Sequence, residues 1–238
     1  NTTGTQNTAT GVNSMLCNID GNDNTAMGVS ALRCNTTGDR NTSIGLQSSY
    51  KTTGDDNTAL GTCALFENTT ASDNTAIGAF SLKLNTTGTK NVAVGANSLD
   101  ANTTADENTA VGTSALTANT TGHSNVAVGC GSLVANTTGF RNVGVGLGSL
   151  ASNTEGEYNV GVGKDAGEAT TTGDYNTFLG SFAGFKNTTA SNNTAVGGLA
   201  LLDNTTGHSN ASVGLSALEN NTTGCFNVAM GVCALYTN

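Results

Sequence analysis

The segment Asn91-Val-Ala-Val-Gly-Ala-Asn-Ser-Leu99 decides the fold, because variants of it recur along the whole chain. Asn125-Val-Ala-Val-Gly-Cys-Gly-Ser-Leu133 is a nearly identical copy. Successive copies are separated by 17 residues, except for one step of 16 between Asn41 and Asn57. The first residue of the pattern is always Asn, at Asn7, Asn24, Asn41, Asn57, Asn74, Asn91, Asn108, Asn125, Asn142, Asn159, Asn176, Asn193, Asn210 and Asn227. Tandem repetition at a fixed period is typical of solenoid proteins.

The repeating unit reads NTTGxxN[TV]AφGxx[AS]Lxx, where φ is a large aliphatic residue, and its positions are numbered as slots 1 to 17. We place the unit starts at residues 1, 18, 35, 51, 68, 85, 102, 119, 136, 153, 170, 187, 204 and 221. Slot 11 is always Gly, and slot 4 is Gly or Ala. We interpret residues 1–238 as a single repeat domain of 14 coils, without a second domain.

The period predicts β-structure, since helical-hairpin repeats need about 33 residues or more and two glycines per unit disfavour a helix. We expect one strand at slots 8–10 and a second around slots 13–15, with the small residue of slot 14 and the Leu of slot 15 inside. Glycine at slots 4 and 11 would supply positive-φ corners. The fold class is therefore all-β, a β-solenoid (parallel β-roll) of fourteen 17-residue coils, with equivalent residues stacked about 4.8 Å apart.

The Asn of slot 7 suggests a structural role. Stacked in register, its side-chain amides can form a hydrogen-bonded ladder. A catalytic or ligand-binding Asn is the alternative, but fourteen equivalent copies favour the ladder. Charged residues vary at slots 1, 3, 5, 6, 12, 13, 16 and 17, which we therefore expect to face solvent.

Composition excludes several functions. The 238 residues include 41 Thr, 32 Asn and 32 Gly, only 11% are charged, and the net charge is −9. The eight basic residues are scattered, which argues against nucleic-acid binding. No apolar run approaches the roughly 18 residues of a membrane span, and the amino-terminal residues lack the features of a signal peptide.

No motif indicates an enzyme or a cofactor. The sequence has no Ser/His/Asp set, no unique pair of carboxylates and no phosphate loop. His123 and His208 both fall in slot 5, five coils apart, and cannot share a metal; we expect solvated turn histidines. Acidic residues gather at the same turns without calcium-loop spacing, and we expect them to serve solubility: Asp23, Asp39, Asp55, Asp56, Asp73, Asp106, Glu107 and Asp174.

Two cysteines allow a disulfide. Cys17 and Cys34 share a slot in adjacent coils, so stacking would bring their Cα atoms about 4.8 Å apart. A bond and two free thiols both remain open. Cys63, Cys130 and Cys233 lie in distant coils and cannot pair within a straight solenoid.

The slot 1 asparagines match the N-glycosylation acceptor N-x-[ST]. Glycans on every one of these asparagines would crowd one another, so we expect at most partial glycosylation. The candidates are Asn35, Asn68, Asn85, Asn102, Asn119, Asn136, Asn187, Asn204 and Asn221.

Each coil has only two large apolar residues, at slots 10 and 15, which is little burial for one chain. Small residues at slots 9 and 14 would let another backbone approach, so we expect a homo-oligomer. The first and last units lack a polar cap, which indicates either part of a longer chain or a subunit that stacks end to end into a filament.

The segments Asn91–Leu99 and Asn125–Leu133 resemble the head repeats of YadA-like trimeric autotransporter adhesins. The stretch Gly180-Ser-Phe-Ala-Gly-Phe-Lys-Asn-Thr-Thr189 is similar to repeat shafts of phage and virus tail-fibre proteins. The resemblance covers all fourteen units and implies a left-handed, trimeric parallel β-roll. The adhesin repeat is shorter, and NTTG is an added turn here.

These features predict a structural rod segment of an extracellular adhesin or virion fibre, located outside the cell, at the cell surface or on a virion. It would present or space an attachment function toward a surface receptor or glycan that the sequence does not identify. The alternatives are an ice- or crystal-binding solenoid using Thr columns at slots 2 and 3, and a self-assembling extracellular filament subunit. Neighbouring Thr residues point to opposite sides, so only one such column would face outward.

Overall fold

The computed structural model describes residues 1–237, which form fourteen strands and no helix. The strands are β1 (Thr8–Thr10), β2 (Thr25–Met27), β3 (Thr42–Ile44), β4 (Thr58–Leu60), β5 (Thr75–Ile77), β6 (Val92–Val94), β7 (Thr109–Val111), β8 (Val126–Val128), β9 (Val143–Val145), β10 (Val160–Val162), β11 (Thr177–Leu179), β12 (Thr194–Val196), β13 (Ala211–Val213) and β14 (Val228–Met230). Their order in the parallel sheet follows the chain. The prediction of an all-β solenoid with a strand at slots 8–10 is confirmed.

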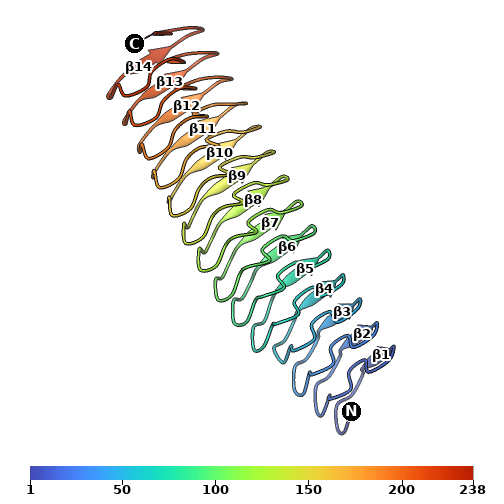
Figure 1. Cartoon of the computed structure of the whole chain (residues 1–238). Helices are drawn as coiled ribbons and strands as arrows, with labels where there is room; N and C mark the ends of the chain where they lie inside the picture. Colours follow the sequence, from blue (N-terminus) through green and yellow to red (C-terminus); the bar gives the residue numbers. More distant parts are fainter. Residues whose placement is uncertain (238) are drawn as a thin grey trace. The chain divides into compact units, whose positions relative to one another are not determined.

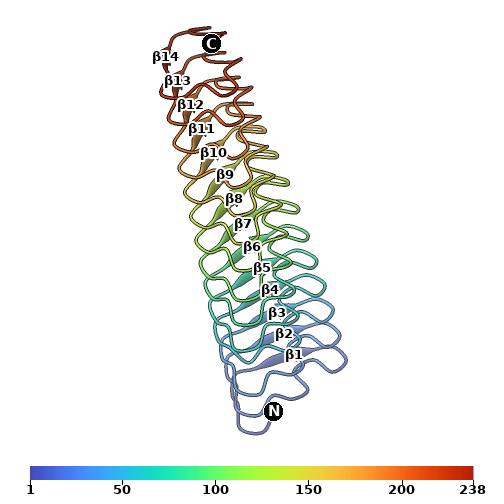
Figure 2. The same cartoon turned by 60° about the vertical axis from the view of Figure 1, so that its left-hand side comes forward.

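The chain divides into two compact units, Asn1–Thr121 with β1 to β7 and Gly122–Asn238 with β8 to β14. In the first unit like slots pair in register, as Ala76 pairs with Ala93. In the second unit the same register pairs Gly144 with Gly161. Within each unit the strands lie on one side of their coils (Figure 1), and turns close the rest of each coil (Figure 2). Both units therefore repeat one coil geometry.

Hydrogen bonds between coils continue through the turns. Ser30 N–H donates backwards to the Val12 carbonyl at 2.8 Å, and Leu32 N–H donates forwards to the Ser48 carbonyl at 3.0 Å. The φ angles at Ser30 and Leu32 are 58° and 50°, in the left-handed region. The expected second strand at slots 13–15 is therefore wrong for the described part of the chain. Left-handed residues alternate there, which turns the amides of slots 13 and 15 toward opposite neighbouring coils, while the Ala31 amide between them donates to Gly28 of its own coil.

The two recurrent glycines are favoured for different reasons, and only the one at slot 11 is invariant. At slot 11, Gly78 has a φ of 133°, and a Cβ on it would lie 2.5 Å from the Gly95 carbonyl oxygen. At slot 4, Gly21 is not in the left-handed region, yet a Cβ would lie 2.5 Å from the Gly38 oxygen. The positive-φ prediction is thus confirmed for slot 11 and wrong for slot 4, where close approach of the next coil is the cause.

The interior of each coil is narrow. In the sixth coil, slots 9, 14 and 15 are Ala93, Ser98 and Leu99, all fully buried. Slots 9 and 14 lie opposite one another, since Ser132 Oγ donates to the Gly144 carbonyl at 2.9 Å. The small residues therefore pack inside the coil, and the expectation that slots 9 and 14 receive another chain is wrong.

The one-residue deletion lies inside the fourth coil. Thr52 N–H donates to the Ser49 carbonyl at 3.3 Å, the bond that slot 1 makes to slot 15 in other coils, and Asn68 Nδ2 reaches Thr52 Oγ1 at 3.5 Å. Thr52 therefore occupies slot 1, and the fourth unit begins at residue 52 instead of 51. Lys51 ends the third coil, where its ammonium pairs with Glu67.

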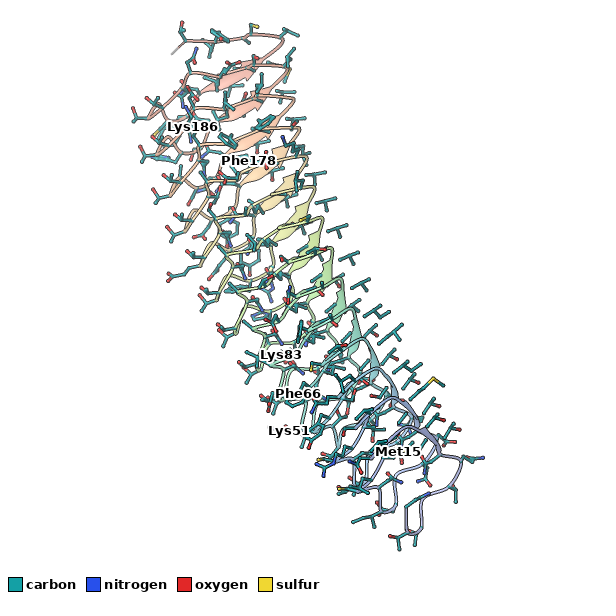
Figure 3. The ribbon with its side chains drawn as sticks, turned by 45° about the vertical axis from the view of Figure 1, so that its right-hand side comes forward. Met15, Lys51, Phe66, Lys83, Phe178 and Lys186 are labelled. Atoms are coloured by element: carbon teal, nitrogen blue, oxygen red, sulfur yellow. The ribbon has the colours of Figure 1, made fainter. Side chains whose placement is uncertain are left out.

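Phe178 replaces two leucines. Its ring occupies slot 9 of the eleventh coil and is fully buried inside it (Figure 3). Slot 15 of the tenth and eleventh coils is Gly167 and Gly184, where most coils have Leu. A Cβ on Gly167 would lie 2.5 Å from the Phe178 ring, and one on Gly184 would clash with the same ring. The large and small residues therefore compensate one another.

Phe178→Ala should lower the free energy of unfolding by about 3–5 kcal/mol, because it leaves a cavity. Leucines added at Gly167 and Gly184 should restore much of the loss, since slot 15 carries Leu at similar φ angles elsewhere. Gly184→Leu alone should destabilise the chain. Urea unfolding followed by circular dichroism measures all four proteins, and equal midpoints for the single Ala and triple variants would contradict the compensation.

Candidate functional site

The Asn of slot 7 links each coil to both neighbours. Asn91 Oδ1 accepts the backbone N–H of Asn108 at 3.0 Å, and Asn91 Nδ2 donates to the Ala105 carbonyl at 2.8 Å. The same Nδ2 lies 3.2 Å from Asn74 Oδ1. The structure therefore contains the expected ladder. Its shorter bonds join side chain to backbone, and direct amide-to-amide contacts are secondary.

A second Asn ladder occupies slot 1. Asn102 Nδ2 donates to Asn85 Oδ1 at 2.9 Å and to the Ala105 carbonyl at 3.1 Å. Both asparagines are fully buried, so the expectation that slot 1 faces solvent is wrong. The sequence does contain a signal for this second ladder, because Asn fills slot 1 almost as often as slot 7. With Lys51 assigned to slot 1, that slot instead has the charge variation of a solvent-facing position.

Burial of this ladder also removes the glycosylation sites. The side-chain amide that would carry a glycan already donates hydrogen bonds inside the coil, where a transferase cannot reach it. The asparagines that the prediction named are all fully buried in the fold: Asn35, Asn68, Asn85, Asn102, Asn119, Asn136, Asn187, Asn204 and Asn221. Their burial in the fold argues against N-glycosylation at these positions.

The slot 1 ladder is interrupted between the tenth and eleventh coils. Slot 1 of the eleventh coil is Thr170, which is too short to reach the preceding Asn153. Asn153 Oδ1 and Thr170 Oγ1 are buried and have no hydrogen-bond partner among residues 1–237. Buried polar atoms without partners are costly, so this coil step is a local weakness.

Thr170→Asn should raise the free energy of unfolding by about 1 kcal/mol, because the new amide can donate to Asn153 Oδ1. The reverse change at an intact step, Asn102→Thr, should lower it by about 1–3 kcal/mol by leaving a buried acceptor unpaired. Urea titrations of the two variants and the parent chain test both. A neutral or destabilising Thr170→Asn would show that the gap cannot accept the larger side chain.

Slots 8, 10 and 12 form the outer strand face, whose side chains point away from the coil interior. Slot 10 was expected in the core but lies outside, because side chains alternate along a strand. In the first unit the exposed aliphatic residues of this face are Val12, Met27, Val29, Leu46, Leu60 and Val111. In the second unit they include Val128, Leu147, Val162, Leu179 and Leu215. Figure 3 shows rows of side chains projecting outward from the strands.

The Thr pairs of slots 2 and 3 present one outward column. Thr86 at slot 2 is partly buried, and its hydroxyl donates to the Thr103 carbonyl of the next coil at 2.9 Å. Thr87 at slot 3 is exposed. The slot 2 hydroxyls therefore serve the coil stack, which leaves no two-column Thr array on this side.

The turn residues of slot 5 serve the backbone. Asp106 Oδ1 accepts the N–H of Thr89 in the preceding coil at 2.6 Å, and Asp174 accepts that of Glu157 at 2.8 Å. The acidic turns therefore help to hold the coils together in addition to keeping the surface charged. His123, also at slot 5, is exposed as expected, and its ring stacks on the next coil.

Of the two alternatives for Cys17 and Cys34, the structure has the free thiols. Cys17 and Cys34 are free thiols, as are the other four cysteines. Side chains at one slot of parallel coils run side by side, with Cβ atoms separated by about the strand spacing of 4.8 Å. This exceeds the roughly 3.8 Å that disulfides prefer.

The surroundings shift the pKa values of Asp100 and Asp56 in opposite directions. Burial raises the pKa of Asp100, although the charge of Lys83 partly opposes this, and Asp100 Oδ1 has no hydrogen-bond partner within residues 1–237. Asp56 is exposed, and its hydrogen bonds to the Arg40 guanidinium lower its pKa.

Asp100→Asn should raise stability at neutral pH. A carboxyl with a raised folded pKa contributes its full stabilisation below its unfolded pKa of about 3.9, and that contribution is lost as pH rises through the folded value. Asp56→Asn should act in the opposite direction, because the contribution of a lowered pKa is present above pH ~3.9 and lost in acid. Unfolding midpoints between pH 3 and pH 7 measure both, and equal pH profiles for the two variants would contradict the assignment.

Residues 1–237 contain no surface pocket and no group of three or more His, Cys, Asp or Glu side chains placed to hold a metal. The same residues include no helix that is long and apolar enough to cross a membrane. No protein-family model matches the sequence, and no curated protein sequence matches it. The outer strand face is the feature of the described surface that a partner could recognise.

Proposed function

We propose that this chain is a structural repeat section of an extracellular adhesin or virion fibre, which assembles with copies of itself through the outer strand face. Its role is to space or present a surface-attachment function toward a receptor or glycan, without catalysis. The aliphatic column at slot 10 carries this proposal, extended at some coils by exposed aliphatic residues of slot 12. Contiguous apolar strips on a protein surface mark interaction sites, whereas scattered apolar residues do not.

The chemistry of the outer strand face suits an interface. Slots 8 and 10 hold no charged residue in any coil, and slot 12 holds only Lys164. The chain as a whole has a net charge of −9, and its charged residues therefore lie almost entirely outside the outer strand face. Depletion of charge is the compositional mark of an interface core.

A copy of the same chain is the partner that fits this face best. The side chains of the face repeat at the strand spacing of about 4.8 Å, and another molecule with the same spacing can match them coil by coil. Symmetric self-association is also the commonest form of assembly for soluble proteins. The resemblance to trimeric adhesin head repeats favours three copies.

The test compares charged substitutions on two surfaces of the first unit. Leu60→Glu with Val111→Glu places two carboxylates on the outer strand face, and Thr70→Glu with Thr104→Glu places two on the exposed slot 3 column. Desolvating unpaired charges is costly, so the first pair should weaken association on the order of 100-fold, and the second should not. Sedimentation velocity measures the oligomer, and circular dichroism checks the fold.

A parent chain that sediments as a monomer at all concentrations would overturn the proposal. So would an oligomer that both double variants leave unchanged, because the interface would then lie elsewhere.

A further inference from the structure

Four aromatic rings follow one another along the turns that precede β8 to β11 in the second unit. The His123 and Phe140 rings stack with centroids 4.9 Å apart, and Phe140 meets Tyr158 edge to face at 5.6 Å. Tyr158 and Tyr175 then stack at 4.8 Å, with their planes only 5° apart. The column ends on two tyrosines in direct contact.

The tyrosine pair is held in register by the backbone. Both residues occupy slot 6 with left-handed φ angles of 55° and 56°. Tyr158 N–H donates to the Phe140 carbonyl at 3.2 Å, and Tyr175 N–H donates to the Glu157 carbonyl at 3.0 Å. The centroid separation of 4.8 Å and the 5° angle between the planes place the two phenol rings face to face.

One ring is fixed and the other is accessible. The Arg141 guanidinium donates to the Tyr158 hydroxyl and lies 5.4 Å from the centre of its ring. The same guanidinium lies 5.7 Å from the centre of the Phe140 ring. Tyr175 is 58% exposed. An oxidant in solution can therefore reach a phenol whose nearest ring is a second phenol.

We propose that Tyr158 and Tyr175 form a modification site for oxidative coupling to dityrosine, which joins the tenth and eleventh coils covalently. A haem peroxidase with hydrogen peroxide removes one electron and the phenolic proton from each tyrosine. The two radicals form a carbon–carbon bond between their ortho positions, and each ring regains aromaticity as its ortho hydrogen moves to oxygen. The protein loses two hydrogen atoms, and one peroxide becomes two waters.

The position of this link gives it a structural use. It spans the coil step at which Asn153 Oδ1 and Thr170 Oγ1 are buried without partners. The ladder that joins other coils is thus interrupted at the step that the two tyrosines bridge on the surface. The link lies within one chain and does not depend on the proposed assembly.

The remaining tyrosines provide internal controls. Tyr50 stacks on Phe66, and the Tyr236 hydroxyl donates to Glu219. Neither has a tyrosine neighbour in an adjacent coil. Oxidation should therefore produce one link within the chain, between Tyr158 and Tyr175.

The experiment treats the purified full chain with a haem peroxidase and limiting hydrogen peroxide. We expect dityrosine fluorescence, a monomer mass lower by two hydrogen atoms, and a linked pair of tryptic peptides, 142–164 and 165–186, since cleavage follows Arg141, Lys164 and Lys186. Tyr158→Phe and Tyr175→Phe keep the ring stack and should each abolish the link. Tyr50→Phe and Tyr236→Phe should leave its yield unchanged.

Any of three results would overturn the proposal. These are a folded parent chain that stays unmodified, coupling that occurs only between chains, and a link that survives in Tyr158→Phe or Tyr175→Phe. Loss of the link in urea, with random coupling in its place, would support the requirement for the folded register.

Discussion

Hydrogen bonding between coils at one strand spacing is the constraint on which the structure depends. Each strand covers only three residues, yet amides in the turns also donate to neighbouring coils, backwards from Ser30 and forwards from Leu32. Buried amides must find such partners, and alternating left-handed residues supply them without a second strand. Every coil must therefore present its groups at the same height, which favours coils of nearly constant length.

The thin cross-section explains why the interior is partly polar. Small residues at slots 9 and 14 meet across the coil, so Leu at slot 15 is the main apolar filling. Asn side chains at slots 1 and 7 complete the interior, because each amide can accept from one coil and donate to another. Phe178 shows how strict the available volume is, since its ring coexists only with glycine at positions 167 and 184.

The same register organises the surface. Aliphatic residues of slot 10 form columns outside the strands, acidic residues of slot 5 accept amides of the preceding coil, and aromatic rings of slots 5 and 6 stack. Because each slot recurs in every coil, one residue type at one slot forms a continuous strip of the same chemistry along the surface. Such strips favour partners that share the spacing, and they bring pairs such as Tyr158 and Tyr175 together.

The sequence alone determined the period, the strand at slots 8–10, the invariant corner at slot 11 and the ladder of slot 7, because each depends on spacing that the chain displays openly. Only the tertiary structure decided which faces point inward. It showed that slot 10 lies outside and slots 1 and 9 lie inside, and that the deletion follows Thr52 and leaves Lys51 in slot 17. The reason is physical. The sequence shows how often a residue type recurs at a slot, but the direction of that side chain depends on the φ angles of the turns between strands. Those angles are selected by hydrogen bonds to coils that lie 17 residues away.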